Sequence, residues 1–111
     1  MPYENFMNSL EKNIFISRLF DFYKNLLTQK QCDIFTSYYF NDIGLTEIAS
    51  NMFVTKQTVL DSIKQTEKKL QDYEKKLKLY EIYSSQVKLI DEINQTKDYS
   101  KINNIINLWG D

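Results

Sequence analysis

The sequence predicts an all-α protein, and three observations support this fold class. The 111-residue chain has two glycines and a single proline, Pro2, so no proline interrupts it after the first residues. Apolar residues recur at helical spacing along most of the chain. No stretch alternates polar and apolar residues as a strand does. With 42% hydrophobic residues, residues 1–111 suit one domain, a helical bundle that contains a helix-turn-helix and a long C-terminal helix.

The first two predicted helices precede the motif. Residues 10–27 carry an apolar stripe at every third or fourth position, formed by Ile14 or Phe15, Leu19, Phe22 or Tyr23, and Leu26. Thr28 followed by Gln31 is typical of a capping box, so a second helix begins there and runs to about Phe40. We expect it to bury Cys32, Phe35 and Tyr39, with help from Ile34 and Tyr38. Asn41, Asp42 and Gly44 then predict a turn.

Residues 45–64 have the pattern of a helix-turn-helix. Leu45, Ile48, Ala49 and Met52 lie on one face of a short first helix. Thr55 is a good N-cap for a second helix, because its hydroxyl can accept hydrogen bonds from the open N–H groups of the first turn. Val59 and Ile63 can then pack that second helix against the first. Ala49 is the only alanine of the chain, and a small residue there allows the two backbones to approach closely. An ordinary helical hairpin is the alternative.

Phe53 departs from this pattern, since it stands where such motifs usually have glycine. A bulky residue at positive φ costs roughly 1 to 2 kcal/mol. We therefore expect either a remodelled turn with Phe53 packed on a neighbour, or Asn51 helping to end the first helix.

The second helix of the motif has an apolar stripe that continues far beyond residue 64. Its members follow the four-three spacing of a heptad seam: Val59, Ile63, Thr66, Leu70, Tyr73, Leu77 and Tyr80. If the helix continued to Ile93, it would be on the order of 55 to 60 Å long. Ser84 and Ser85 are a possible bend or break. Residues 65–111 are therefore expected to form a long helix and a C-terminal helix that serve in dimerisation.

A last helix is predicted near the C-terminus, where Asp98 or Ser100 can act as its cap. Its apolar face consists of Ile102, Ile105, Ile106 and Trp109, and Gly110 ends it. It can fold back over part of the long stripe. Because the stripe is longer than this tail, a homodimer remains the preferred hypothesis.

The surface that could read double-stranded DNA lies opposite the apolar stripe. Rotation along the helix places Gln57, Asp61, Lys64, Lys68 and Lys75 there, and Lys56 and Thr58 flank its N-terminus. Gln57 could bond to adenine, and lysines to guanine or phosphate. Thr46 and Thr55 lie near helix starts and could position a phosphate. Asp61 opposes binding unless it accepts from a cytosine. The alternative is a solvated charged face with pairs such as Asp61 with Lys64.

Composition excludes several classes of function. The net charge of −1 lacks the excess of basic residues found in general nucleic-acid binders, so any DNA affinity must come from a local patch. With no histidine and one cysteine, Cys32, we expect no metal, no cofactor and no disulfide. No phosphate-binding loop or nucleophile motif is present, so an enzyme is not expected. The absence of a long apolar stretch or signal peptide predicts a cytoplasmic protein without a membrane partner.

The chain also resembles a known family. FDFYKNLLTQKQCDIFTSYYFNDIGLTEIA, VTKQTV and IKQTEKKLQDYEKKLKLY, within residues 19–80, resemble the YlxM-like helix-turn-helix proteins of Gram-positive bacteria and mollicutes. These are similar to region 4 of sigma factors, which binds a promoter element. The resemblance implies that Thr55, Lys56, Gln57, Thr58 and Lys64 face DNA, and it implies a link to the signal recognition particle (SRP).

Two hypotheses follow for function. The first is a DNA-binding regulatory protein whose paired motifs read half-sites about 34 Å apart. The second is an interaction factor that contacts protein or RNA components of the signal recognition particle through the lysine-bearing helix between Lys64 and Lys88.

Overall fold

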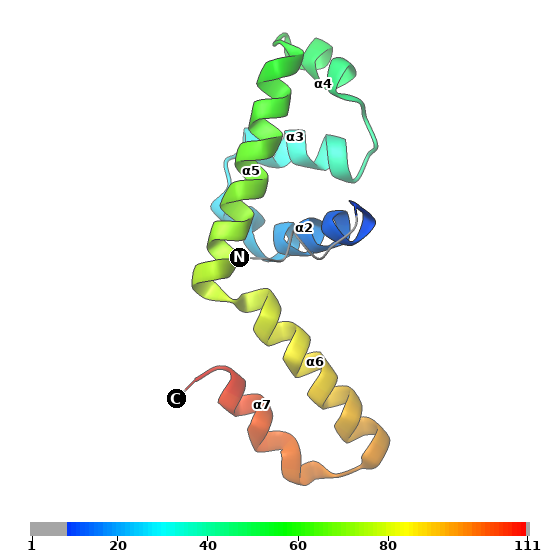
Figure 1. Cartoon of the computed structure of the whole chain (residues 1–111), viewed down its shortest axis with the longest axis vertical. Coiled ribbons are helices and arrows are strands. Elements are labelled where there is room, and N and C mark those ends of the chain that lie inside the picture. The colour runs from blue at the N-terminus through cyan, green and yellow to red at the C-terminus, as the bar shows by residue number, and fades with distance from the viewer. Residues whose placement is uncertain (1–8, 111) are drawn as a thin grey trace.

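The computed structural model describes residues 9–110, and Figure 1 labels their helices. The α-helices are α2 (Ser9–Tyr23), α3 (Gln29–Tyr39), α4 (Leu45–Met52), α5 (Lys56–Leu77), α6 (Leu79–Thr96) and α7 (Ile102–Leu108). Two short 3-10 turns, η1 (Lys24–Leu26) and η2 (Tyr99–Lys101), precede α3 and α7. The described residues contain no strand, so the prediction of an all-α fold is confirmed.

Helix α5 is the axis of the molecule. Helices α2, α3 and α4 lie against it one after another, and α6 and α7 form a hairpin beyond its C-terminal end (Figure 1). The molecule measures 57 × 26 × 25 Å along its principal axes. The helix-turn-helix and the hairpin therefore occupy opposite ends of an elongated chain.

The main core lies where α2 crosses α5. It contains Ile16, Leu19, Phe20 and Tyr23 from α2, Phe35 from α3 and Leu70 from α5. The rings of Phe20 and Phe35 stack with centroids 4.4 Å apart. The predicted stripe of the first helix is thus shifted, because Ile14 is half exposed and Ile16 is buried. The α-helix also ends at Tyr23 rather than near residue 27.

Helix α3 begins with the predicted capping box. The Thr28 hydroxyl accepts from the Gln31 N–H at 3.2 Å, and the Gln31 side chain accepts from the Thr28 N–H at 3.0 Å. Phe35 is buried as expected, whereas Tyr39 and Cys32 are only partly buried. The Cys32 thiol donates to the Lys24 carbonyl at 3.4 Å.

The helix that begins after Thr55 does not continue to Ile93, since the chain breaks at Lys78 rather than at the possible bend of Ser84 and Ser85. Lys78 adopts a left-handed conformation with φ 57°, whereas Ser84 and Ser85 lie inside α6. The seam residues Val59, Ile63, Thr66 and Leu70, which pack within the same chain, are buried. That part of the seam is therefore unavailable to a second copy.

A buried carboxylate explains the break. Glu74 accepts from the Tyr23 hydroxyl at 2.6 Å and from the N–H groups of Tyr80 and Glu81 at 3.1 Å each. The Tyr23 hydroxyl in turn accepts from the Leu79 N–H at 3.1 Å. Three N–H groups in the first turn of α6 thus find acceptors, so the chain can end one helix and begin another here.

The last helix folds back as predicted, against α6. Asp98 caps the short turn η2 by accepting from the Ser100 N–H at 3.1 Å. The Trp109 indole N–H donates to the Gln86 side chain at 2.8 Å, and Lys101 pairs with Glu92. Of the two helices, only Ile93 contributes a buried hydrophobic side chain.

Candidate nucleic-acid interface

The helix-turn-helix has its own small core. Ile48 and Ala49 of α4 pack against Val59 and Ile63 of α5, and Ile34 of α3 completes the cluster. All five side chains are at most 5% exposed. The motif is therefore a unit of three helices, and the sequence analysis did not identify α3 as the third. Ile34 was the available signal, because it is the apolar residue of α3 that does not face the main core.

The turn between α4 and α5 holds Phe53 in the left-handed region, with φ 58°. The Val54 N–H donates to the Ala49 carbonyl at 3.0 Å, which is a Schellman arrangement that requires a left-handed residue before Val54. Both expected alternatives are wrong. The Phe53 side chain is 95% exposed rather than packed, and Asn51 lies within α4.

Helix α5 begins as predicted. Thr55 is its N-cap, and the Thr55 hydroxyl accepts from the Thr58 N–H at 3.1 Å. The two threonine hydroxyls lie 2.9 Å apart, and both side chains are exposed. The first turn of α5 is therefore fixed in place by its own residues and points into solvent.

The predicted DNA-facing ridge of α5 is exposed in the structure. Its members are Lys56, Gln57, Asp61, Lys64 and Lys68. The Gln57 amide donates to the Asp61 carboxylate at 2.8 Å, so Asp61 pairs with Gln57 rather than with Lys64. This hydrogen bond fixes the orientation of the Gln57 carboxamide. It uses the amide nitrogen of Gln57 and does not involve the amide oxygen.

Charge along α5 is more favourable to DNA than the charge of the whole chain. The helix has six lysines and four acidic residues. Two of the four carboxylates are engaged by tyrosines, Glu67 by Tyr39 and Glu74 by Tyr23. The exposed carboxylates that remain are Asp61 and Asp72, so the outer surface of α5 is locally basic.

The length of α5 limits which residues could enter a groove. At about 1.5 Å per residue, Lys64 and Lys68 lie about 12 and 18 Å along the axis from Lys56. The major groove is about 12 Å wide. If α5 entered a groove N-terminus first, the segment from Lys56 to Lys64 would lie within that width and Lys68 beyond it.

Thr46 lies apart from this ridge, near the start of α4. Its side chain is exposed, and Gly44 occupies the N-cap without a side-chain hydrogen bond. In a helix-turn-helix the first helix crosses the DNA backbone. The position of Thr46 suits a phosphate contact of that kind.

Comparison with known proteins identifies the family. A family model described as "Putative helix-turn-helix protein, YlxM / p13 like" matches residues 10–108. The chain belongs to this family. A UPF0122 protein of Limosilactobacillus reuteri (strain DSM 20016) is 42% identical over 103 residues, which cover 88% of this chain and 91% of that protein. A UPF0122 protein of Geobacillus sp. (strain WCH70) is 44% identical over 90 residues, which cover 81% and 79% of the two chains.

Membership of this family confirms the resemblance seen in residues 19–80. It also extends it, because the match includes most of the C-terminal hairpin. The family is one of helix-turn-helix proteins rather than of enzymes. The motif in α4 and α5 is therefore the part of the chain that best indicates its function.

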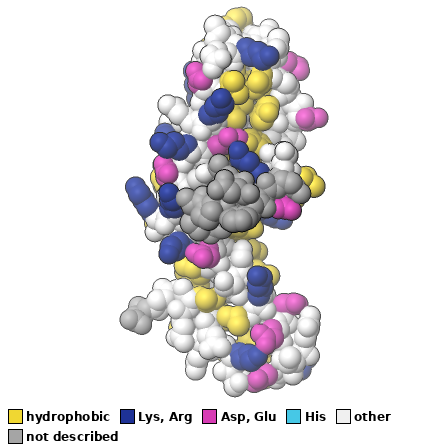
Figure 2. Space-filling model, viewed as in Figure 1, with side chains coloured by type: hydrophobic (Ala, Val, Ile, Leu, Met, Phe, Trp, Pro, Cys, Tyr) yellow, Lys and Arg dark blue, Asp and Glu magenta, His cyan; other side chains and the backbone are white. Residues whose placement is uncertain are grey.

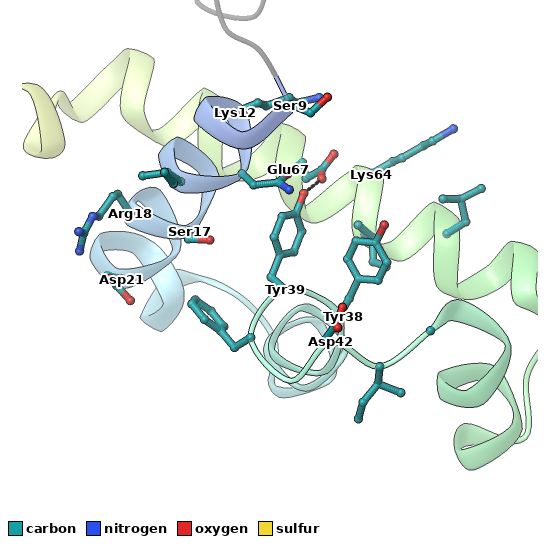
Figure 3. Close-up of a pocket in the computed structure, with 17 residues that line it drawn as sticks. Ser9, Lys12, Ser17, Arg18, Asp21, Tyr38, Tyr39, Asp42, Lys64 and Glu67 are labelled. Atoms are coloured by element: carbon teal, nitrogen blue, oxygen red, sulfur yellow. Dashed lines mark hydrogen bonds between the residues drawn. The ribbon is translucent and has the colours of Figure 1, made fainter.

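A groove lies beside the ridge, between α2, the end of α3 and α5, and Lys64 of the ridge forms part of its wall (Figure 3). Its volume is about 800 Å³, and its wall carries charges of both signs, including Arg18, Asp21 and Lys64. Tyr39 points across it to Glu67. Burial, and then the hydrogen bond with Glu67, raise the pKa of the Tyr39 hydroxyl well above its usual range.

The wall of the groove includes hydroxyl, carboxylate and basic side chains. Its wall contains no thiol, and the chain has no histidine. Within residues 9–110 no three His, Cys, Asp or Glu side chains gather as a metal site would require. None of the helices in that range combines the length and the apolar character needed to cross a membrane.

Proposed function

We propose that this protein binds double-stranded DNA through α5 and acts as a regulatory protein. The observation that supports this most directly is the first turn of α5, where Lys56 and Gln57 project from a helix end that Thr55 and the motif core hold in place. Recognition helices of this class place their N-terminal residues against base edges. Gln57 has the amide chemistry that pairs with adenine, and Lys56 can contact guanine or phosphate.

A duplex-binding measurement tests this proposal. Fluorescence anisotropy with a labelled 30-base-pair duplex should show binding that weakens as salt rises, because lysine contacts release counterions. The double variant Lys56→Ala with Gln57→Ala should lose on the order of tenfold or more in affinity. Lys88→Ala removes an exposed lysine from α6 and is the matched control. Equal binding by all three proteins would exclude the assigned surface.

Asp61 provides a second test of the same surface. Its carboxylate lies one turn after Gln57 on the ridge, where it repels phosphate. Asp61→Asn keeps the hydrogen-bonding shape and removes the charge, so the affinity for a duplex should rise a few-fold at low salt. A fall in affinity would indicate that Asp61 accepts a hydrogen bond from the DNA.

The hairpin of α6 and α7 is the proposed surface for a homodimer. Exposed apolar side chains gather on it: Tyr83, Val87, Ile90, Ile102, Ile106 and Trp109. The hairpin lies at the end opposite the motif (Figure 1), and the molecule is about 26 Å wide. Two copies side by side would therefore hold their motifs at least that far apart, which is compatible with half-sites about 34 Å apart.

Sedimentation measurements test the dimer. The unmodified protein should sediment as a dimer at micromolar concentration, and Ile106→Glu should be a monomer, because a charge in an apolar interface is not solvated. Leu10→Glu alters an exposed apolar residue of α2 and should leave the dimer intact. A monomer in every case would exclude this interface.

The alternative function is an interaction with the signal recognition particle. The observation that favours it is the row of exposed lysines that continues along α5 past the span of a DNA groove, with Lys68, Lys75 and Lys76. Such a row can contact the phosphates of RNA. Tagged protein that carries Lys56→Ala and Gln57→Ala should then still recover the particle's RNA or protein from cells. Failure to recover either would count against this function.

A further inference from the structure

The exposed ring of Phe53 is the feature of the motif that its fold does not explain. Phe53 is 95% exposed, so it contributes almost nothing to packing. Its φ of 58° is a conformation that glycine or asparagine adopts at lower cost. The side chain therefore neither relieves the turn nor stabilises the core.

The other non-glycine residues with positive φ in the described chain do not combine that backbone conformation with an exposed apolar side chain. Asp42, Lys78 and Lys97 also have positive φ, but each has a charged side chain that is solvated in water. Phe53 exposes an aromatic ring instead. Residues held in costly conformations without a packing benefit occur preferentially at binding sites.

The surroundings of the ring indicate what kind of partner fits it. Phe53 lies two residues before Thr55, the N-cap of α5, at the end of the molecule formed by the turn between α4 and α5 (Figure 1). The segment from residue 48 to residue 60 contains Lys56 and no acidic residue. On the face seen in Figure 2, basic and acidic side chains are interspersed over the molecule, including this end. Exposed carboxylates flank this segment at Glu47 and Asp61, but within it no carboxylate lies next to Phe53 in sequence to repel a duplex.

We infer that Phe53 is a specificity-determining residue that contacts the methyl group of a thymine in the major groove. This inference rests on the proposed binding of DNA through α5. If the first turn of α5 enters the groove, the turn that immediately precedes it lies beside the base edges. The thymine methyl is the apolar group that a duplex presents there, and phenylalanine is among the residues that contact it.

The test compares two duplexes that differ only in that methyl group. The first is a 30-base-pair duplex of alternating A·T pairs, and the second has deoxyuridine in place of every thymine. The unmodified protein should bind the thymine duplex about fourfold more tightly, the effect of burying one methyl group. Phe53→Gly should bind both duplexes with the affinity that the unmodified protein has for the deoxyuridine duplex.

Two further measurements separate a contact with DNA from a role in folding. Phe53→Gly and Phe53→Asn relieve the left-handed strain, so each should raise Tm by several degrees. Loss of thymine preference in a more stable protein cannot result from unfolding. Leu10→Ala removes another exposed apolar side chain, far from the motif in sequence, and should keep the preference.

The outcomes distinguish the inference from the proposed function. If the unmodified protein binds neither duplex, the DNA-binding function is wrong and the inference fails with it. If it binds both duplexes equally, or if Phe53→Gly retains the preference, only the role of Phe53 is excluded. A Phe53→Gly protein that loses affinity for both duplexes to the same extent would also exclude the methyl contact.

Discussion

Helices α2 to α5 contain eleven of the twelve buried hydrophobic side chains of the described chain, whereas α6 and α7 contain only Ile93. Both regions are mostly helical, but their apolar side chains have different roles. In the first region apolar residues hold a helix-turn-helix in shape. In the second many of them remain exposed on a shorter hairpin, although its apolar residues also recur at helical spacing. Helical spacing alone therefore does not tell a core from a surface.

The largest expected effect comes from Leu70, which is 0% exposed in the main core. Leu70→Ala should lower the free energy of unfolding by about 2 to 5 kcal/mol, because it removes buried methyl groups and leaves a cavity. Val87→Ala on α6 should cost about 0.5 kcal/mol or less, since Val87 is half exposed. Urea unfolding in the Ile106→Glu background, which should be a monomer, measures both. Equal losses would show that the hairpin is as tightly packed as the core.

Glu74 should have the next largest effect, because it joins the two regions. Glu74→Ala leaves the Tyr23 hydroxyl and the N–H groups of Tyr80 and Glu81 without their acceptor. The free energy of unfolding should fall by about 1 to 3 kcal/mol. Hydrogen exchange of the first-turn amides of α6 should also become faster. The control is Glu81→Ala, whose side chain is exposed, and it should leave both measurements unchanged.

The sequence predicted best what local chemistry determines. The caps at Thr28 and Thr55 depend on residues three positions away, and both formed as expected. The stretch from Leu45 to Met52 became a helix with the expected apolar face. The candidate ridge, from Lys56 to Lys68, is exposed for the same reason, because its side chains are the polar positions of an amphipathic helix.

Long-range chemistry explains what the sequence did not predict. The break at Lys78 depends on Tyr23 and Glu74, which lie 51 residues apart in the chain. Ser84 and Ser85 had the better local propensity for a bend, but no such partner acts on them. Phe53 shows the opposite case, in which the strain predicted for a bulky residue in the turn is present and no packing offsets it.

The contact between Tyr23 and Glu74 should make the free energy of unfolding depend on pH in the alkaline range. Burial, and then the hydrogen bond to Glu74, raise the pKa of Tyr23 to about 12. An unfolded tyrosine titrates near pH 10. Because the pKa is raised in the folded state, the contribution of Tyr23 to the free energy of unfolding is complete below pH 10. It is lost as the pH rises to about 12. Chemical denaturation at several pH values should therefore show that the free energy of unfolding falls more steeply between pH 10 and 12 in the unmodified protein than in Tyr23→Phe.

The control for this measurement is Tyr99→Phe, because Tyr99 is exposed. Its stability should follow the same curve as that of the unmodified protein. At neutral pH, Tyr23→Phe should itself cost about 1 to 3 kcal/mol, since it removes the hydrogen bond to Glu74 and the one from the Leu79 N–H. If the loss between pH 10 and 12 were as steep in Tyr23→Phe as in the unmodified protein, it would come from other groups such as Tyr39, whose pKa is also raised.

The smallest expected effect concerns the junction residue itself. Lys78 has a φ of 57° and an exposed side chain, so its backbone conformation costs free energy that no contact of the side chain requires. Lys78→Gly should raise the free energy of unfolding by about 0.5 to 1 kcal/mol. Lys76→Gly, two residues earlier within α5, should lower it by about 1 kcal/mol, because glycine is a poor helix former. Opposite signs in urea unfolding would show that the junction is a fixed break, whereas a loss in both variants would mean that α5 and α6 behave as one helix in solution.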